Sequence, residues 1–191
     1  MANMYMKLGD NPVKGAATAL VKGGGKISKK GWFAIRSLSW HASRSIPMSI
    51  GDGYNRDTGE LMLSPIMLTK EMCGASEVLL SRFYVPGEFG DTVDVIITKP
   101  SRTGQGAEVY LHVVVDHARI ADYNISIADG ATPFESLALA YSKIGLKHWN
   151  ELKGGKLEAG GEVTFDLSSG QAVSHAIKGG GGGGGASIKE L

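Results

Sequence analysis

The sequence contains a single cysteine, Cys73, among its 191 residues. One cysteine cannot form a disulfide within the chain, which excludes a domain held together by disulfides and favours synthesis in a reducing compartment. The first apolar stretch is interrupted by Lys7 and has no apolar core of a signal peptide, so we expect no cleavable secretion signal. No apolar run approaches the length of a membrane span, and we expect no membrane insertion.

An excess of one charge is also missing, because 20 Lys and Arg residues balance 19 Asp and Glu residues to a net charge of +1. This balance gives no electrostatic reason to expect binding of nucleic acid or of an anionic membrane. The chain length fits one domain, which would bury about 70% of its unfolded surface. We place this domain at residues 1–178 and a flexible tail at 179–191, since the polyglycine run at 179–185 has no side chains to pack.

Alternation of apolar and polar residues at every second position dominates the sequence and predicts β-strands. The strands are expected at residues 32–41, 61–70, 92–98, 108–116, 121–127, 137–141 and 163–167. The rows expected to face the core are Val93, Val95 and Ile97; Val109, Leu111, Val113 and Val115; Tyr123, Ile125 and Ile127; Leu137, Leu139 and Tyr141; and Val163, Phe165 and Leu167. Strands with one apolar and one polar face are typical of antiparallel sheets around a single core.

Two of these segments carry signs of a bend. The apolar phase of residues 32–41 slips by one position after Arg36, which predicts a β-bulge or a barrel corner. Pro65 should hold the strand at 61–70 near an edge or a bend, because proline cannot donate a hydrogen bond to a neighbouring strand. Together the segments predict a mainly β fold of about eight or nine strands, a small antiparallel β-barrel or sandwich of two packed sheets.

One flanking α-helix is expected beside the barrel. Ser76 has the residue type of an N-cap, Glu77 suits the first turn, and an apolar stripe over residues 78–84 ends before Pro86. Residues 143–152 fit either a continued strand or a short helix. Two stretches read as loops, a basic one at residues 8–30 with five lysines and one at 47–60 with strong turn signals.

The inventory of catalytic and metal-binding motifs is nearly empty. Residues 23–28 (GGGKIS) resemble a phosphate-binding loop but lack its first glycine, and an isoleucine separates the lysine from the serine. Asp116 with His117, and His148, offer titratable groups without a nucleophile motif or a second histidine at metal-ligand spacing, so the polar face of a strand explains them and His112 better. We expect no catalytic residue, no metal site and no cofactor.

A calcium loop and a reactive thiol are equally weak hypotheses. Asp52, Asn55, Asp57 and Glu60 could surround a cation, but their spacing is not that of an EF-hand, and a polar hairpin loop explains them. Cys73 has no neighbouring histidine or cluster of lysines, so we expect a buried structural thiol.

Several strings over about residues 5–144 resemble the Hcp family (hemolysin-coregulated protein), the tube protein of type VI secretion. They are the opening residues 5–7 (YMK), residues 31–40 (GWFAIRSLSW), residues 68–70 (LTK) followed by 75–76 (AS) and the helix, residues 123–126 (YNIS), and residues 133–144 (PFESLALAYSKI). The last string is the most specific, and each one alone would be weak. The loop before Gly31 and the segment after Ile144 are longer than is usual in the family.

The resemblance implies a twisted β-barrel whose copies form a homohexameric ring, and rings that stack into a hollow tube. It further implies three partners: a contractile sheath, a VgrG spike, and secreted effectors carried in the lumen. It places a ring-stacking loop at residues 47–60, with Tyr54, Arg56 and Asp57 as contact candidates. The protein would be cytoplasmic on synthesis and then secreted, without a signal peptide, to the extracellular space or a target cell.

Three alternatives remain beside this interpretation. A tail-tube protein of a phage-like contractile particle would share the architecture. A ligand-binding β-barrel would need a roomy interior, whereas the inward-facing residues are bulky enough to fill a small barrel. A hydrolase using Asp116, His117 or His148 has the least support. The tube interpretation predicts a ring with a wide central hole, whereas the last two alternatives predict a monomer or small oligomer with a pocket.

Overall fold

The computed structural model describes residues 3–9, 13, 17, 21–22, 31–46, 48, 50–51, 59–101, 106–155 and 157–174. Within these ranges it has thirteen strands and one helix. They are β1 (Asn3–Leu8), β2 (Val21–Lys22), β3 (Trp32–Ile35), β4 (Ser37–Ser39), β5 (Ala42–Arg44), β6 (Leu61–Leu63), β7 (Ile66–Glu71), α1 (Ser76–Tyr84), β8 (Asp91–Pro100), β9 (Ala107–Ser126), β10 (Phe134–Ala140), β11 (Lys143–Glu151), β12 (Leu157–Asp166) and β13 (Gln171–Ser174). In the described residues, no helix has the length and apolarity needed to cross a bilayer.

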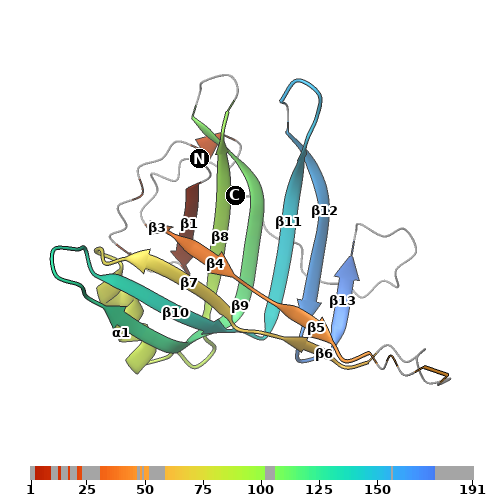
Figure 1. Ribbon diagram of the computed structural model, residues 1–191, viewed down its shortest axis with the longest axis horizontal. Helices are drawn as coiled ribbons and strands as arrows, with labels where there is room; N and C mark the ends of the chain where they lie inside the picture. Colours follow the sequence, from red (N-terminus) through yellow and green to blue (C-terminus); the bar gives the residue numbers. More distant parts are fainter. Residues whose placement is uncertain are drawn as a thin grey trace.

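The strands form two layers that cross each other, with α1 at one side (Figure 1). The first layer contains β3, β1, β8, β9, β11, β12 and β13, and the second contains the end of β9 with β10, β7 and β4. All pairs are antiparallel except the short pair of β2 with β9. The predicted mainly β fold, an antiparallel barrel of two packed sheets with one flanking helix, is confirmed.

Strand β9 belongs to both layers and therefore holds them together. Its first part pairs with β8 and β11, and its last part, from Arg119 to Ser126, pairs with β10. Between the two parts lies His117, whose φ of 54° places a residue with a side chain in the left-handed region. This uncommon conformation marks the point where the strand bends from one layer into the other.

The two bends predicted from the sequence lie where the layers meet. β3 pairs with β1 in the first layer, whereas β4 pairs with β7 in the second, and Arg36 separates them. The phase slip is therefore a barrel corner. The strand expected at 61–70 is likewise divided at Ser64 and Pro65 into β6 and β7. Residues 143–152, which the sequence left open, are strand β11 through Glu151.

The core lies between the layers and follows the predicted rows over most of their length. Its members are Met6, Leu8, Val13, Phe33, Ile35, Ile66, Leu68, Ala75, Leu79, Val93, Val95, Val113, Val115, Ala118, Leu137, Leu139 and Ile144. Bulky side chains from both layers thus fill the barrel. Burying such side chains at about 25 cal/mol per Å² of apolar surface is the main stabilising term of the fold.

A second buried cluster lies on the opposite side of the first layer and was not predicted. Tyr5, Trp32, Ile96 and Val109 are buried there, and Ala17 and Trp149 are among the residues that pack against them. The predicted row of β9 therefore fails at Val109, which joins this second cluster, since the register of β8 against β9 shifts between Ile97 and Thr98.

Other predicted core residues are exposed. Ile125 and Ile127 on the β9–β10 side are 40% and 72% exposed, and Val163 and Leu167 are 41% exposed. The strands were placed correctly, but here they run past the core, so the apolar row has no opposing layer. The count of eight or nine strands was too low because bends divide two of the expected strands and β2 and β13 are short.

The helix has its predicted bounds but not its predicted cap. The N-cap position is Ala75, and Ser76 is the first helical residue. The Ser76 hydroxyl makes no capping bond and instead accepts a hydrogen bond from the Cys73 N–H and faces buried polar groups. The residue that looked like a cap therefore serves a buried polar cluster.

Candidate functional site

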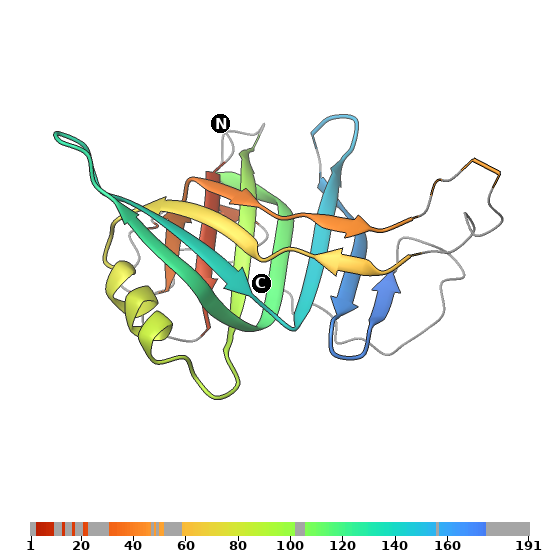
Figure 2. The same cartoon turned by 60° about the horizontal axis from the view of Figure 1, so that its bottom comes forward.

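A two-stranded hairpin projects from the barrel at the end of the second layer (Figures 1 and 2). We call residues 42–63 the arm, of which the structure describes 42–46, 48, 50–51 and 59–63. Its strands β5 and β6 pair with each other in a separate two-stranded sheet, with Ala42 opposite Leu63 and Arg44 opposite Leu61. Among the described residues of the arm, four large apolar side chains are exposed: Ile46, Met48, Ile50 and Met62. A lone hairpin of this kind is at best marginally stable in water.

The base of the arm is fixed to the barrel by hydrogen bonds. The Trp40 indole N–H donates to the Tyr141 hydroxyl, which in turn donates to the Ser64 carbonyl oxygen at 3.0 Å. The Ser64 N–H donates to the His41 carbonyl at 2.9 Å, and the Ser64 hydroxyl accepts from the His41 N–H. Burial raises the pKa of Tyr141, although the bond from Trp40 opposes this shift. Residues 40, 64 and 141 thus set where the arm leaves the barrel.

The arm contains the loop in which contact residues were predicted. Tyr54, Arg56 and Asp57 lie outside the described residues, as do Asp52 and Asn55, so these predictions stay predictions. Gly59 lies at the edge of this loop, with a φ of +63°, and a Cβ there would come within 2.1 Å of the Ser45 carbonyl oxygen. The Arg44 guanidinium donates to the Gly59 carbonyl at 3.1 Å. Only glycine fits this turn.

A buried polar cluster lies under the opposite end of the second layer. The Lys70 ammonium forms an ion pair with the Glu135 carboxylate, and both side chains are completely buried. Ser76 donates to the same Glu135 oxygen at 2.9 Å and accepts from Lys70 at 2.9 Å. The Tyr123 hydroxyl donates to the other Glu135 oxygen at 2.7 Å. Burial, followed by the bond to Glu135, raises the pKa of Tyr123.

This cluster joins four elements, and Lys70, Glu135 and Ser76 are buried while Tyr123 is half-buried. Lys70 comes from β7, Glu135 from β10, Tyr123 from β9 and Ser76 from α1. A buried charge pair needs further hydrogen bonds to offset the loss of hydration, and here the hydroxyls of Ser76 and Tyr123 supply them. The arrangement suits an anchor of α1 to the second layer. The sequence strings pointed to these residues, but nothing in them showed that they meet.

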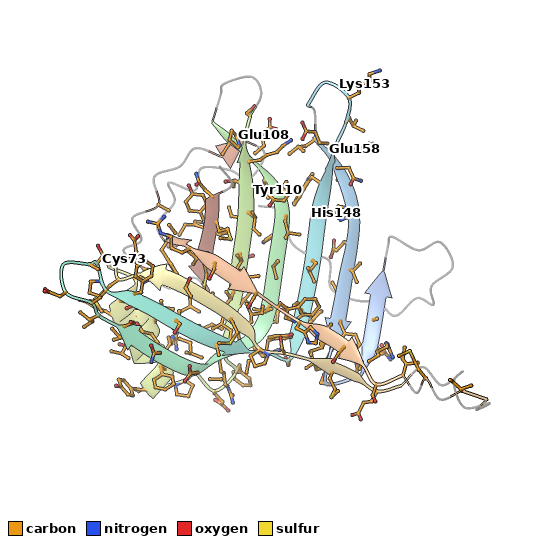
Figure 3. All side chains as sticks on the ribbon, in the orientation of Figure 1. Cys73, Glu108, Tyr110, His148, Lys153 and Glu158 are labelled. Carbon is orange, nitrogen blue, oxygen red and sulfur yellow. The ribbon has the colours of Figure 1, made fainter. Side chains whose placement is uncertain are left out.

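The titratable residues singled out in the sequence do not form one site, because His148 lies apart from Asp116 and His117. Asp116 accepts a hydrogen bond from the Thr92 hydroxyl, and His117 shares one with Ser142. Asp116 lies opposite Lys143 on β11, whereas His148 lies five residues further along that strand, about 17 Å away. Figure 3 shows His148 near the upper end of the first layer. No acid–base pair of a hydrolase arises from these residues.

Two predictions about polar side chains need correction. His112 was expected on a polar outer face but is 2% exposed, because the second apolar cluster covers that side, and its ring nitrogen lies 2.9 Å from the Asp94 carboxylate. Cys73 is a free thiol that is half-buried rather than buried, at the side of the molecule that carries α1 (Figure 3). Over the described ranges, no group of three His, Cys, Asp or Glu side chains could hold a metal ion.

Comparison with known proteins gives a consistent result. The model of the family described as "Type VI secretion system effector, Hcp" matches residues 5–148. The chain is similar to a solved "type six secretion system protein", with a TM-score of 0.74, 23% identity, and coverage of 91% of this chain and 100% of that one. It is also similar to Hcp1 from Salmonella typhimurium (TM-score 0.62, 13% identity, 90% and 99% covered). Hcp1 from E. coli EAEC 042 gives a TM-score of 0.60, with 18% identity and coverage of 86% and 98%. No curated protein matches the chain.

Proposed function

The chain belongs to the Hcp family of the type VI secretion system and is a tube subunit of that system, and from its geometry we propose that it assembles into stacked homohexameric rings. The observation that carries the proposal is the arm. It leaves the barrel with exposed apolar side chains and with no pairing to the rest of the described protomer. A second copy would cover these side chains and make the arm stable.

The assembled tube would have a structural role, carrying other proteins, and would not act as an enzyme. We propose that it meets a contractile sheath on its outside and a VgrG spike at its end, and that effectors travel in its lumen. Proteins of this family are secreted by the type VI system. The tube would therefore carry this chain from the cytoplasm to the extracellular space or into a target cell.

The filled interior argues against the two alternatives outside the injection-tube class. Phe33, Leu68 and Leu137 are among the buried side chains that occupy the space between the layers, where a ligand-binding barrel would keep a cavity. A hydrolase built on Asp116 or His117 would gain a second titratable partner only from His148, and the pairing of β9 with β11 holds His148 away from both. A phage-like tail tube shares the architecture, and the family match favours secretion.

Electron microscopy of the purified protein with mass measurement in solution tests this function. We expect rings with a central hole, or stacks of rings, and a particle of six times the mass of the chain. A protein that stays monomeric at micromolar concentration, or particles without a central hole, would contradict the proposal.

A further inference from the structure

The arm presents more apolar surface than its own protomer covers. Met48 is 88% exposed, Ile50 is fully exposed, and Ile46 and Met62 are each at least half exposed. Single exposed apolar residues are common, but four exposed on one hairpin that no layer of the protomer covers are typical of a protein interface. The unbranched methionines can adapt to an irregular partner surface.

A second apolar patch lies at the other end of the second layer. The ion pair of Lys70 and Glu135 lies on the core side of this layer, and Ile125 lies opposite Glu135 on the same side. Met72 and Ile127 continue that side past the ends of β7 and β9, since every second residue faces the same way. These three side chains are 40–72% exposed. We call them, Met72, Ile125 and Ile127, the tip.

The arm and the tip are the two ends of one strand path. The chain runs from Met62 in the arm through Pro65 and along β7 to Met72 at the tip. Ten residues of nearly extended chain span about 33 Å. Both views show the arm at one end of the molecule and the β9–β10 turn at the opposite end (Figures 1 and 2). The two patches therefore cannot meet within one protomer.

We propose that the arm of one copy docks on the tip of the next copy in the assembly. This inference rests on the proposed function and names the surfaces that make its subunit contact. Two different patches at opposite ends give a heterologous contact, which repeats from copy to copy and closes into a ring or continues as a stack. Because the patches terminate the same layer, each contact also extends that layer from one copy into the next.

Another exposed apolar group could compete for the arm. Tyr84 is the last residue of α1, Val85 and Phe89 follow it, and the three side chains are 70–72% exposed. They lie at the end of the helix and just after it, outside the strand path that joins the arm to β7. A copy placed along that path reaches the tip and not the end of the helix. This difference makes Val85 the matched control position.

Cysteine crosslinking distinguishes docking of the arm on the tip from docking on the exposed group at the end of α1. Cys73, the only cysteine, is first replaced by serine, and Met62→Cys is then combined with Ile127→Cys or with Val85→Cys. A disulfide needs Cα atoms within about 7 Å, so it reports direct docking and cannot form across one protomer. We expect oxidation of the Met62→Cys, Ile127→Cys variant to give a ladder of dimers, trimers and larger covalent species. Variants with one cysteine can give dimers only.

The outcomes distinguish this contact from the proposed function. Rings that form normally, with no ladder from the Ile127 pair or with a ladder from the Val85 pair instead, overturn the arm–tip contact and leave the tube subunit intact. A chain that forms no oligomer at all overturns both. Electron microscopy of each variant before oxidation shows which case applies.

A charge exchange at the same positions provides a test without oxidation. Met62→Glu and Ile127→Lys lie at exposed positions, so each is expected to leave the protomer folded. Each alone should raise the concentration at which half of the subunits are assembled by about ten-fold or more, because an unpaired charge would be buried. Both changes in one chain should restore assembly, and a double variant as weak as the singles contradicts the contact.

Discussion

Two ion pairs involve residues of β7, Lys70 with Glu135 and Arg36 with Glu71, and they differ strongly in burial. The Lys70–Glu135 side chains are 0% exposed, whereas those of Arg36 and Glu71 are 63% and 39% exposed. Removing one member of a buried pair leaves an uncompensated charge. We expect Lys70→Met to lower the free energy of unfolding by about 3–5 kcal/mol. Arg36→Met should change it by about 1 kcal/mol or less, as measured by urea denaturation.

The double variant Lys70→Met, Glu135→Leu serves as the control for this prediction. It replaces both charges with apolar side chains of similar size, so no charge is left buried. We expect it to recover most of the stability lost in Lys70→Met. A double variant as unstable as the single one would show that the polar cluster stabilises the fold in some way other than by charge compensation.

The tyrosine in this cluster predicts how stability changes in alkaline solution. Burial, followed by the bond to Glu135, raises the pKa of Tyr123 above the ordinary value of about 10 for a tyrosine. Above this value the unfolded chain loses the phenolic proton while the folded chain keeps it, so the free energy of unfolding falls as the pH rises. The slope per proton is at most about 1.4 kcal/mol per pH unit. Tyr123→Phe should reduce it in urea titrations between pH 9 and 11, and Tyr84→Phe, at an exposed site, should not.

At the scale of elements, the orientation of the arm depends on Tyr141. Its hydroxyl accepts from Trp40 and donates to the Ser64 carbonyl, at the two chain segments that enter and leave the arm. Tyr141→Phe leaves both partners without this bond, which costs about 1–3 kcal/mol for groups shielded from water. We expect faster amide hydrogen exchange in β5 and β6 with little change in β8. If the amide exchange rates in β5 and β6 are the same in Tyr141→Phe as in the unchanged protein, other contacts hold the arm.

The pairing of β11 with β12 depends on a glycine. A Cβ at Gly160 would lie 2.7 Å from the His148 ring and 2.8 Å from its carbonyl oxygen. Because the register of these strands shifts at this point, the backbone has little room to move. Gly160→Ala should therefore destabilise the fold by about 1–3 kcal/mol in thermal or urea unfolding. Gly87→Ala, where a Cβ meets only the flexible end of Arg82 at 3.3 Å, is the matched control.

The sequence predicted elements better than it predicted surfaces. The corner at Arg36 and the bend at Pro65 were found because a phase slip and a missing N–H are local signals. The burial of Ile125 and Ile127 was predicted wrongly because the two-residue period tells which side chains share a face but not where the opposite layer ends. His112 was wrongly predicted to be exposed because its side of the sheet is covered by residues distant in sequence. Trp32 and Trp149 belong to or pack against the cluster that covers it.

At the scale of the molecule, the candidate sites show the same limit. The buried cluster pairs Lys70 with Glu135 over 65 positions and Ser76 with Glu135 over 59 positions, separations that no local pattern reveals. Resemblance to a family did point to the strings that contain these residues, without their contacts. It also placed a ring-stacking loop at residues 47–60, which stays a prediction, whereas the structure alone shows that the arm projects and that its base is fixed by Tyr141.

The division between barrel and arm predicts that folding and assembly can be separated. The core lies between the two layers, and among the described residues of the arm Leu63 alone packs against it. Replacing residues 45–60 by a two-residue Asn-Gly turn should thus leave the cooperative thermal unfolding of the barrel nearly unchanged, because little buried apolar surface is lost. Assembly should fall sharply in sedimentation, since the exposed patch is removed. Deletion of residues 179–191 is the matched control and should leave assembly intact; a shortened arm that still forms normal stacks would place the subunit contacts elsewhere on the barrel.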